Sequence, residues 1–304
     1  MQTRDLGKTG VMLSAIGLGG MPLSVPDNRP AEDQAIAVIH HAIACGITFI
    51  DTADAYCLDD TETGHNERLI GKALRQLPAS RREKVFVATK GGLIRPQRRW
   101  DRDGSPGHLR AACDASLQAL GVDCIDLYQY HRIDSAVPLK ESLGCLKELQ
   151  QQGKIRFLGV SNFGINDLDA ARSMVDIVSV QNEYSRRHRL PELVPPGQPP
   201  RPEPDTIGTL EYSRRHQLAF LPWSPLNGIG QAKSLGTTDA AVAGIAAARG
   251  VSPQQIVLAW LLAQGPQVIP IPGASRQSSI SDSVKAVDLN LTAAELQALR
   301  AWQK

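Results

Sequence analysis

The sequence predicts a single α/β domain folded as a (β/α)8 barrel, spanning residues 1–304. Short β-branched runs alternate along the chain with longer stretches of helical period, the pattern of strand–helix–strand units. Eight such runs are present, and 304 residues is a usual size for one barrel domain. Ionisable residues also stand at the carboxyl ends of several different runs, which is where barrel enzymes have their active sites.

The elements follow in order along the chain, beginning with a predicted β-hairpin made of Arg4–Gly7 and Gly10–Ser14. The predicted strands are Ala15–Leu18, Thr48–Ile50, Val85–Thr89, Ile125–Tyr130, Phe157–Val160, Ile177–Val180, Ala219–Trp223 and Val268–Ile271. The predicted helices are Ala31–Cys45, Asn66–Leu77, Pro106–Leu120, Pro138–Gln151, Asn166–Met174, Thr206–His216, Thr238–Gly250, Pro253–Ala263, Arg276–Val287 and Ala293–Trp302. Ser105-Pro106 and Ser252-Pro253 mark two helix starts, because a capping serine precedes a proline that suits the first helical position.

An open doubly wound sheet is the alternative architecture for alternating strands and helices. Its dinucleotide-binding form requires G-x-G-x-x-G between the first strand and the first helix. Gly17-Leu-Gly-Gly20 instead leads into Met-Pro-Leu-Ser-Val-Pro26, which is unsuited to the first turn of a helix. The barrel is therefore favoured.

One region interrupts the alternation. The segment Leu193–Pro204 is dense in proline and is predicted to be a loop insertion. Two similar octets flank it, Glu183–Leu190 and Glu211–Leu218. We favour coincidence, because the first octet follows a strand and the second lies late in a helix. The other interpretation is a basic rim on a mobile lid over the site.

Composition excludes several classes of function. A formal net charge of +2 is too small to indicate binding to nucleic acid or to a membrane surface. No stretch reaches the roughly 20 apolar residues of a transmembrane helix, and Met1–Gly20 lacks the features of a signal peptide. Five cysteines without a C-x-x-C pair favour thiols in a reducing compartment. We expect a cytoplasmic protein that is a monomer by default.

The candidate catalytic residues are an aspartate, a tyrosine, a lysine and a histidine at or just beyond successive strand ends. Asp51 and Tyr56 follow the second predicted strand, and Lys90 and His131 end the third and fourth. Each alone has an ordinary structural explanation, such as a turn residue or a packed ring. Together they form an acid–base cluster suited to protonating a carbonyl oxygen. The lysine is expected to lower the phenol's pKa, the aspartate to hold the lysine, and the histidine to hydrogen-bond the substrate oxygen.

These stretches resemble the aldo-keto reductase superfamily over nearly the whole chain. The resemblance rests on Phe49–Tyr56, Gly64–Gly71, Ala88–Lys90, Asp126–His131, Leu158–Phe163, Val180–Ser185, Pro222–Leu226 and Ile269–Arg276. It implies a (β/α)8 barrel that binds NADPH in an extended pose. It also implies that Tyr56 is the proton donor and that Asp51, Lys90 and His131 complete the catalytic tetrad.

The same resemblance implies contacts to the cofactor. Ser161, Asn162 and Gln181 match residues that bind the nicotinamide carboxamide, and Trp223 matches the ring that stacks under the nicotinamide. The remaining implied contacts are Ser224 and Leu226 at the pyrophosphate and ribose, Gly273, Ser275 and Arg276 at the 2′-phosphate, and Ser279 and Asp282 near the adenine. Many relatives have a lysine at the position of Gly273, so phosphate binding here would depend more on Arg276.

The leading hypothesis is reduction of an aldehyde or ketone by NADPH, a reaction that is reversible. The loop Leu93–Ser105, with Trp100 and several arginines, is expected to line the substrate pocket, but the sequence does not name the substrate. One alternative is a cofactor-sensing subunit of the same fold with slow turnover, although no extended N-terminal segment for a partner is present. Another is a Schiff-base aldolase using Lys90, which the cofactor-matching stretches disfavour.

Overall fold

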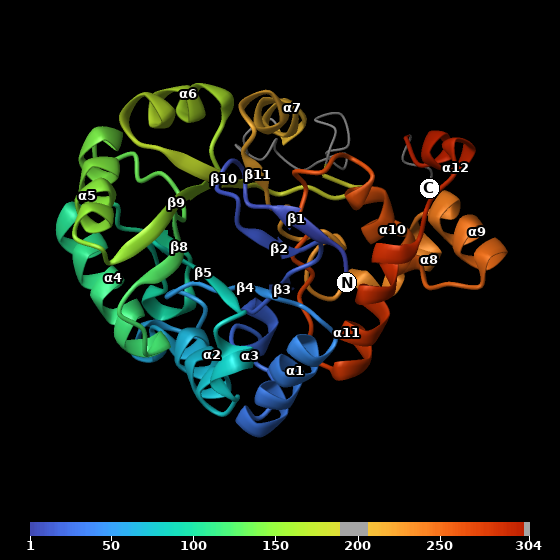
Figure 1. Ribbon diagram of the computed structural model, residues 1–304, viewed down its shortest axis with the longest axis horizontal. Helices are drawn as coiled ribbons and strands as arrows, with labels where there is room; N and C mark the ends of the chain where they lie inside the picture. Colours follow the sequence, from blue (N-terminus) through green and yellow to red (C-terminus); the bar gives the residue numbers. More distant parts are fainter. Residues whose placement is uncertain (189–205, 301–304) are drawn as a thin grey trace.

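Parallel strands form one curved sheet in the computed structural model, which describes residues 1–188 and 206–300. Within these residues the sheet order is β11-β10-β9-β8-β5-β4-β3. The strands are β3 (Leu18–Gly19), β4 (Phe49–Asp51), β5 (Phe86–Gly91), β8 (Ile125–Tyr130), β9 (Ile155–Ser161), β10 (Ile177–Gln181) and β11 (Ala219–Phe220). Strands adjacent in this order are consecutive in the barrel alternation, so each connection crosses outside the sheet, as the barrel prediction requires (Figure 1).

Helices surround this sheet (Figure 1). They are α1 (Glu32–Ala44), α2 (His65–Arg75), α3 (Ala79–Arg82), α4 (Pro106–Leu120), α5 (Leu139–Gln151), α6 (Ile165–Met174), α7 (Thr206–His216), α8 (Leu235–Thr238), α9 (Ala240–Arg249), α10 (Pro253–Leu262), α11 (Gln277–Ser283) and α12 (Ala293–Ala298). The predicted caps are confirmed, since Ser105 and Ser252 accept hydrogen bonds from the backbone of the first helical turn. The predicted helix Arg276–Val287 is instead α11 followed by a 3-10 turn, Val284–Asp288.

The barrel closes through the segment predicted as its eighth strand, Val268–Ile271. Instead of a regular strand, Val268 forms an isolated bridge with Phe220, and Gly273 just after the segment forms one with Gly19. Ile269 donates to the Phe220 carbonyl on one side, and Pro270 and Pro272 accept from Gly17 and Gly19 on the other. Because the prolines have no N–H to return, pairing towards β3 is one-sided. The observed strand β3, Leu18–Gly19, shares only Leu18 with the predicted strand Ala15–Leu18.

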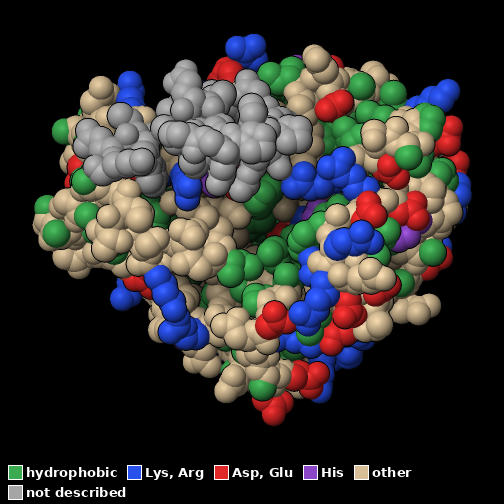
Figure 2. Space-filling view, turned by 180° about the vertical axis from the view of Figure 1, so that it is seen from behind, with side chains coloured by type: hydrophobic (Ala, Val, Ile, Leu, Met, Phe, Trp, Pro, Cys, Tyr) green, Lys and Arg blue, Asp and Glu red, His purple; other side chains and the backbone are tan. Residues whose placement is uncertain are grey.

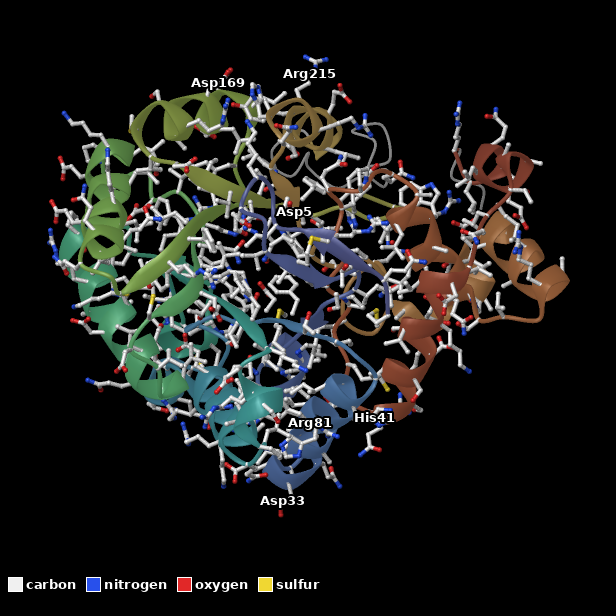
Figure 3. All side chains as sticks on the ribbon, viewed as in Figure 1. Asp5, Asp33, His41, Arg81, Asp169 and Arg215 are labelled. Carbon is white, nitrogen blue, oxygen red and sulfur yellow. The ribbon has the colours of Figure 1, made fainter. Side chains whose placement is uncertain are left out.

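The amino end of the barrel is covered by the predicted hairpin, β1 (Thr3–Asp5) and β2 (Met12–Ser14). Leu6 and Leu13 are buried in the apolar cluster that fills the barrel interior. The Arg4 guanidinium donates hydrogen bonds to the carbonyls of Leu262, Gly265 and Val268, which ties the hairpin to the end of α10 and the segment after it. Side chains occupy the space inside the ring of strands (Figure 3). A functional cavity is therefore expected at the carboxyl end of the strands, away from the hairpin.

The two similar octets have different structural roles. Arg186 of the first is fully buried and pairs with Asp239 at 2.7 Å. Arg215 of the second points outward from α7 and pairs with Glu211 (Figure 3). These roles support coincidence over a shared basic rim. The proline-rich insertion, residues 193–204, and the proposed lid lie outside the described residues.

Two further features bear on the sequence expectations. No helix in the described part of the chain is long and apolar enough to cross a membrane. All five cysteines lie in described residues, and none is in a disulfide.

Candidate active site

The predicted catalytic side chains meet at the carboxyl end of the strands. The Lys90 ammonium, at the end of β5, lies 2.7 Å from Asp51 Oδ2 and 3.0 Å from the Tyr56 hydroxyl. Its third contact is the Thr52 carbonyl at 2.8 Å. The ammonium is completely buried, and three acceptors match its three N–H groups. Burial and these partners therefore fix both the charge and the position of Lys90 beside the phenol.

His131, the residue after β8, packs against the ring of Tyr56. The centroids of the two rings are 5.8 Å apart, and the rings meet edge to face at 77°. Both rings line the same cavity. The Nδ1 atom of His131 is buried and has no hydrogen-bond partner among the described residues.

Burial decides the protonation states of this group. Burial raises the pKa of Tyr56 above its ordinary value, and the opposing effect of Lys90 is smaller. The expectation that Lys90 lowers the phenol's pKa is confirmed as one contribution, but burial outweighs it and the net shift is upward. Burial lowers the pKa of Lys90, but Asp51 and Tyr56 outweigh it and the net shift is upward. Burial and the charge of Lys90 hold the pKa of His131 well below its usual range, so its imidazole is neutral.

The second oxygen of Asp51 is held from the far side of the barrel. Gln181 Nε2, at the end of β10, donates to Asp51 Oδ1 at 2.7 Å, and Gln129 Nε2 of β8 lies 3.4 Å from the same oxygen. Gln181 thus supports the aspartate in addition to lining the cavity. Gln129 was not among the site residues predicted from the sequence. It could have been found as a polar residue on the same face of β8 as the buried Leu127.

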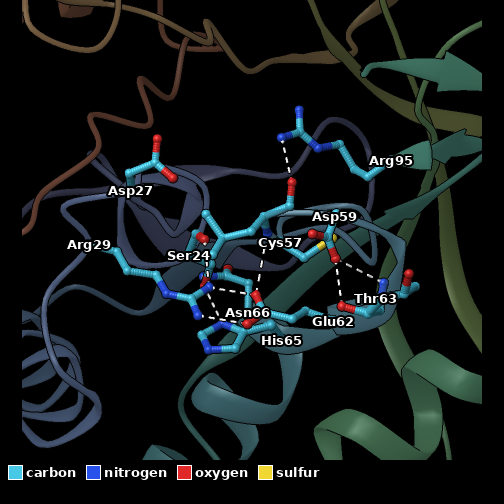
Figure 4. Close-up of polar contacts among 12 residues, drawn as sticks. Ser24, Asp27, Arg29, Cys57, Asp59, Glu62, Thr63, His65, Asn66 and Arg95 are labelled. Atoms are coloured by element: carbon cyan, nitrogen blue, oxygen red, sulfur yellow. Dashed lines mark hydrogen bonds and ion pairs between the residues drawn. The ribbon is translucent and has the colours of Figure 1, made fainter. Parts of the chain in front are cut away.

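The loop around Tyr56 is anchored by a polar network (Figure 4). Arg29 makes a bidentate contact with Glu62, at 2.8 and 2.9 Å, and its hydrogen bonds lower the pKa of that carboxyl to about 2. Asn66 of α2 donates to the Gly20 carbonyl and to Ser24, while its own amide oxygen accepts from Thr52. These contacts tie the segments on both sides of Tyr56 to the loop after β3.

A cavity of about 620 Å³ opens beside these groups. Figure 2 shows the hollow on the face opposite the hairpin, with apolar, cationic and histidine side chains around it. The predicted site residues that line it are Asp51, Tyr56, His131, Ser161, Asn162, Gln181, Trp223, Ser224, Leu226, Gly273, Ser275 and Ser279. Lys90 lies directly behind Asp51 and Tyr56.

Asn162 links the two walls of this cavity. It has a left-handed backbone, with φ of 60°, and follows β9. Its Oδ1 accepts from the Trp223 indole at 3.1 Å, and its Nδ2 donates to the His131 carbonyl at 3.0 Å. Ser224, the residue after this tryptophan, is also left-handed, with φ of 49°. Strain of this kind at two adjoining positions is typical of functional sites.

Two predicted cofactor residues do not line the cavity. Both oxygens of Asp282 accept hydrogen bonds at 2.6 Å, from Ser252 and from Gln255 at the start of α10. In this geometry Asp282 joins α11 to α10, and its contact to adenine stays a prediction. Arg276 is exposed beside the cavity residue Ser275, and no ion pair of its side chain occurs within the described residues.

The structure also adds groups that the sequence argument did not select. Asp54 and Glu67 are buried carboxyls near Lys90, and Glu67 accepts from Thr89 Oγ1 at 2.5 Å. Burial raises the pKa of Glu67 to about 7 and that of Asp54 well above its ordinary value. These two residues could have been selected from the sequence, because they lie in Phe49–Tyr56 and Gly64–Gly71, which carry the family resemblance. No cluster of side chains that could hold a metal ion occurs in the described residues.

Comparisons with known proteins agree with this geometry. The model of the "Aldo/keto reductase family" matches residues 15–304. The chain is 32% identical to a probable aldo-keto reductase of Glycine max, over 98% of this chain and 87% of that protein. Among solved structures it is similar to an aldo-keto reductase of Klebsiella pneumoniae in complex with NADPH, with TM-score 0.78, 27% identity, and 98% and 94% of the two chains covered. A glycerol dehydrogenase of Gluconobacter oxydans gives TM-score 0.78 and 27% identity, with 98% and 93% covered.

Proposed function

The chain belongs to the aldo/keto reductase family, and we propose that it reduces an aldehyde or ketone with NADPH, using Tyr56 as the proton donor. The observation that carries this proposal is the Tyr56 hydroxyl, which lines the cavity while lying 3.0 Å from a buried ammonium. We take the whole chain, residues 1–304, as one barrel domain. We place it in the cytoplasm and treat it as a monomer.

The residues that line the cavity fit NADPH. A partly exposed indole, Trp223, offers an aromatic face, and its Nε1 is already bonded, which fixes the ring. Ser161 and Gln181 supply polar atoms at the ends of β9 and β10. Gly273, Ser275 and the exposed Arg276 supply small residues and a cation where a 2′-phosphate would lie. When bound, NADPH supplies the hydride.

The tetrad divides the work of protonating the carbonyl oxygen. Tyr56 is a neutral phenol at physiological pH, because burial raises its pKa, and it can donate its proton to the developing alkoxide. The Lys90 ammonium stabilises the phenolate that remains, and Asp51 keeps Lys90 in place. The neutral His131 ring lines the cavity beside Tyr56, where it can donate a hydrogen bond to the substrate oxygen.

Consumption of NADPH with a small panel of aldehydes tests this proposal, for the wild type and for Tyr56→Phe. We expect the variant to lose at least about 100-fold in kcat, since general acid catalysis is removed, and to retain NADPH binding. Tight NADPH binding without turnover in the wild type would favour the cofactor-sensing subunit. Absence of NADPH binding would contradict the proposal as a whole.

A further inference from the structure

Trp100 forms a wall of the cavity and comes from the loop after β5. In this loop β6 (Leu93–Ile94) pairs with β7 (Asp101–Arg102), and residues 95–100 connect the two strands. Trp100 lines the cavity together with Leu93. The predicted cofactor residues lie at or after the ends of β9, β10 and β11 and around the closing segment. With the cofactor bound as predicted, Trp100 therefore borders the space left for the substrate.

The ring of Trp100 is held by Arg95. Trp100 is 47% exposed, so its own packing leaves much of the ring in contact with solvent. The Arg95 guanidinium lies over one face of the indole, with its central carbon 3.9 Å from the ring centroid. A cation in this position is attracted to the face of the ring. Arg95 is not among the residues that line the cavity, so it supports this wall from outside.

Arg95 is also bound to the loop that carries Tyr56. Its Nη2 atom donates to the carbonyl of Leu58, two residues after Tyr56, at 3.0 Å (Figure 4). The Leu58 N–H in turn lies 3.4 Å from Glu62 Oε2, the carboxylate oxygen that also pairs with Arg29. One guanidinium thus connects the loop of the proposed proton donor to the aromatic wall.

The turn that brings Trp100 back over Arg95 is locally unfavourable. Gln97 and Arg98 both have left-handed backbones, with φ of 50° and 67°, which is strained for residues other than glycine. Arg95 is only 6% exposed, and its Nε is buried without a hydrogen-bond partner among the described residues. A buried donor left unpaired is destabilising. The contacts of Arg95 to Leu58 and Trp100 are what offset these terms in this turn.

We propose that Arg95 is a positioning residue, which holds Trp100 as the wall for a flat, apolar substrate body and so favours aromatic aldehydes and ketones over short aliphatic ones. This inference rests on the proposed reductase activity. It assigns a specificity role to a residue outside the tetrad, outside the predicted cofactor contacts and outside the lining of the cavity.

Two aldehydes test this assignment: 2-naphthaldehyde, which is flat and apolar, and propanal, which has no ring to pack on an indole. The readout is the ratio of kcat/KM for 2-naphthaldehyde to that for propanal, within each enzyme. We expect a ratio above one in the wild type. Trp100→Ala should lower it about tenfold, mainly through a higher KM for the aromatic aldehyde.

Arg95→Met should change specificity in the same direction as loss of the ring. We expect the ratio to fall about threefold to tenfold, because the ring is no longer held, while kcat for propanal stays within about twofold. Arg95→Lys should fall between Arg95→Met and the wild type, since an ammonium can donate to the Leu58 carbonyl but lacks a planar group that stacks at the same time. Arg99→Gln, exposed in the same turn, is the matched control and should keep the wild-type ratio.

The double variant Arg95→Met, Trp100→Ala separates positioning from a general loss of structure. If Arg95 acts through Trp100, the double variant should have the ratio of Trp100→Ala alone, because the wall is already absent. Acrylamide quenching adds a readout that does not depend on turnover. The fluorescence of Trp100, taken as the difference between each protein and its Trp100→Phe counterpart, should be quenched more readily in Arg95→Met than in the wild type.

The outcomes separate the two proposals. Additive effects of the two substitutions, or an unchanged ratio in Arg95→Met, contradict the positioning role and leave the reductase activity standing. A wild type that prefers propanal, or a Trp100→Ala variant that keeps the wild-type ratio, contradicts the substrate class. Reduction of neither aldehyde contradicts the reductase activity and the inference with it. If Arg95→Met fails to fold, Arg95→Lys and Trp100→Ala still decide the matter.

Discussion

At the scale of single residues, the site depends on charges that are buried together. Lys90 and Asp51 are almost completely inaccessible to solvent, and each satisfies the other. The desolvation penalty of such a pair is large, so neither charge is stable there without its partner. The same burial keeps Tyr56 protonated and His131 neutral. The proposed catalytic roles and the local stability of this group therefore depend on the same burial.

Lys90→Met should lower the free energy of unfolding by about 3–5 kcal/mol, because it leaves the Asp51 carboxylate buried without a cation. Adding Asp51→Asn in the same chain should recover part of this loss. Denaturant unfolding of the single and double variants measures both effects. Equal or greater loss in the double variant would show that the cost is not that of an unpaired carboxylate.

Glu67 should make stability depend on pH. Its folded pKa is raised from 4.5 to about 7, so the folded protein binds more protons than the unfolded chain between these values. Stability contributed by the neutral carboxyl is fully present below pH 4.5 and is lost as the pH rises through 7. The loss is on the order of 3 kcal/mol.

Glu67→Gln removes this titration, so the gap in unfolding free energy between variant and wild type should change in favour of the variant from pH 5 to pH 8. Urea unfolding at a series of pH values checks this. A gap that stays constant across the series would mean that Glu67 does not titrate in this range.

At the scale of elements, α10 and α11 are joined through Asp282. Ser252 caps α10 by accepting from the Gln255 backbone at 3.1 Å, and its hydroxyl also donates to Asp282. The side chain of Gln255 donates to the other carboxylate oxygen. The carboxylate of Asp282, in α11, thus supports the first turn of α10.

Asp282→Ala and Ser252→Ala should each cost about 1–2 kcal/mol of stability, because each breaks the contact that supports the cap of α10. Neither should change the Kd for NADPH by more than about twofold.

Arg276→Gln is the contrasting variant, for which we expect weaker binding of NADPH and unchanged binding of NADH. Calorimetric binding to the folded variants tests this, and a large loss of NADPH affinity in Asp282→Ala would instead support the predicted adenine contact.

At the scale of the whole molecule, the N-terminal hairpin and the proposed catalytic site lie at opposite ends of one barrel. The hairpin at the amino end buries Leu6 and Leu13 against the barrel interior. The tetrad and the cavity lie at the carboxyl end. Changes at the hairpin should therefore affect unfolding without altering the reacting groups.

Leu13→Ala should cost about 2–5 kcal/mol, since the side chain is 1% exposed and its removal leaves a void. Turnover of the folded enzyme should be unchanged. Met12→Ala in the same strand is the control, because Met12 is 54% exposed and its loss should stay within about 0.5 kcal/mol. Thermal unfolding and steady-state kinetics on both variants decide whether the two ends act independently.

The sequence by itself determined the barrel and predicted the four residues proposed as the tetrad. Strand and helix periodicity is local, and parallel strands bring their carboxyl ends to one face, so Asp51, Lys90 and His131 converge once the fold is known. Only the tertiary structure decided that the pKa of Tyr56 is raised and that Asp282 accepts a hydrogen bond from Ser252. Burial sets the first and a partner distant in the sequence sets the second. The structure also decided which residue of the hairpin β6–β7 borders the cavity, since Arg102 lines it and its neighbour Asp101 does not.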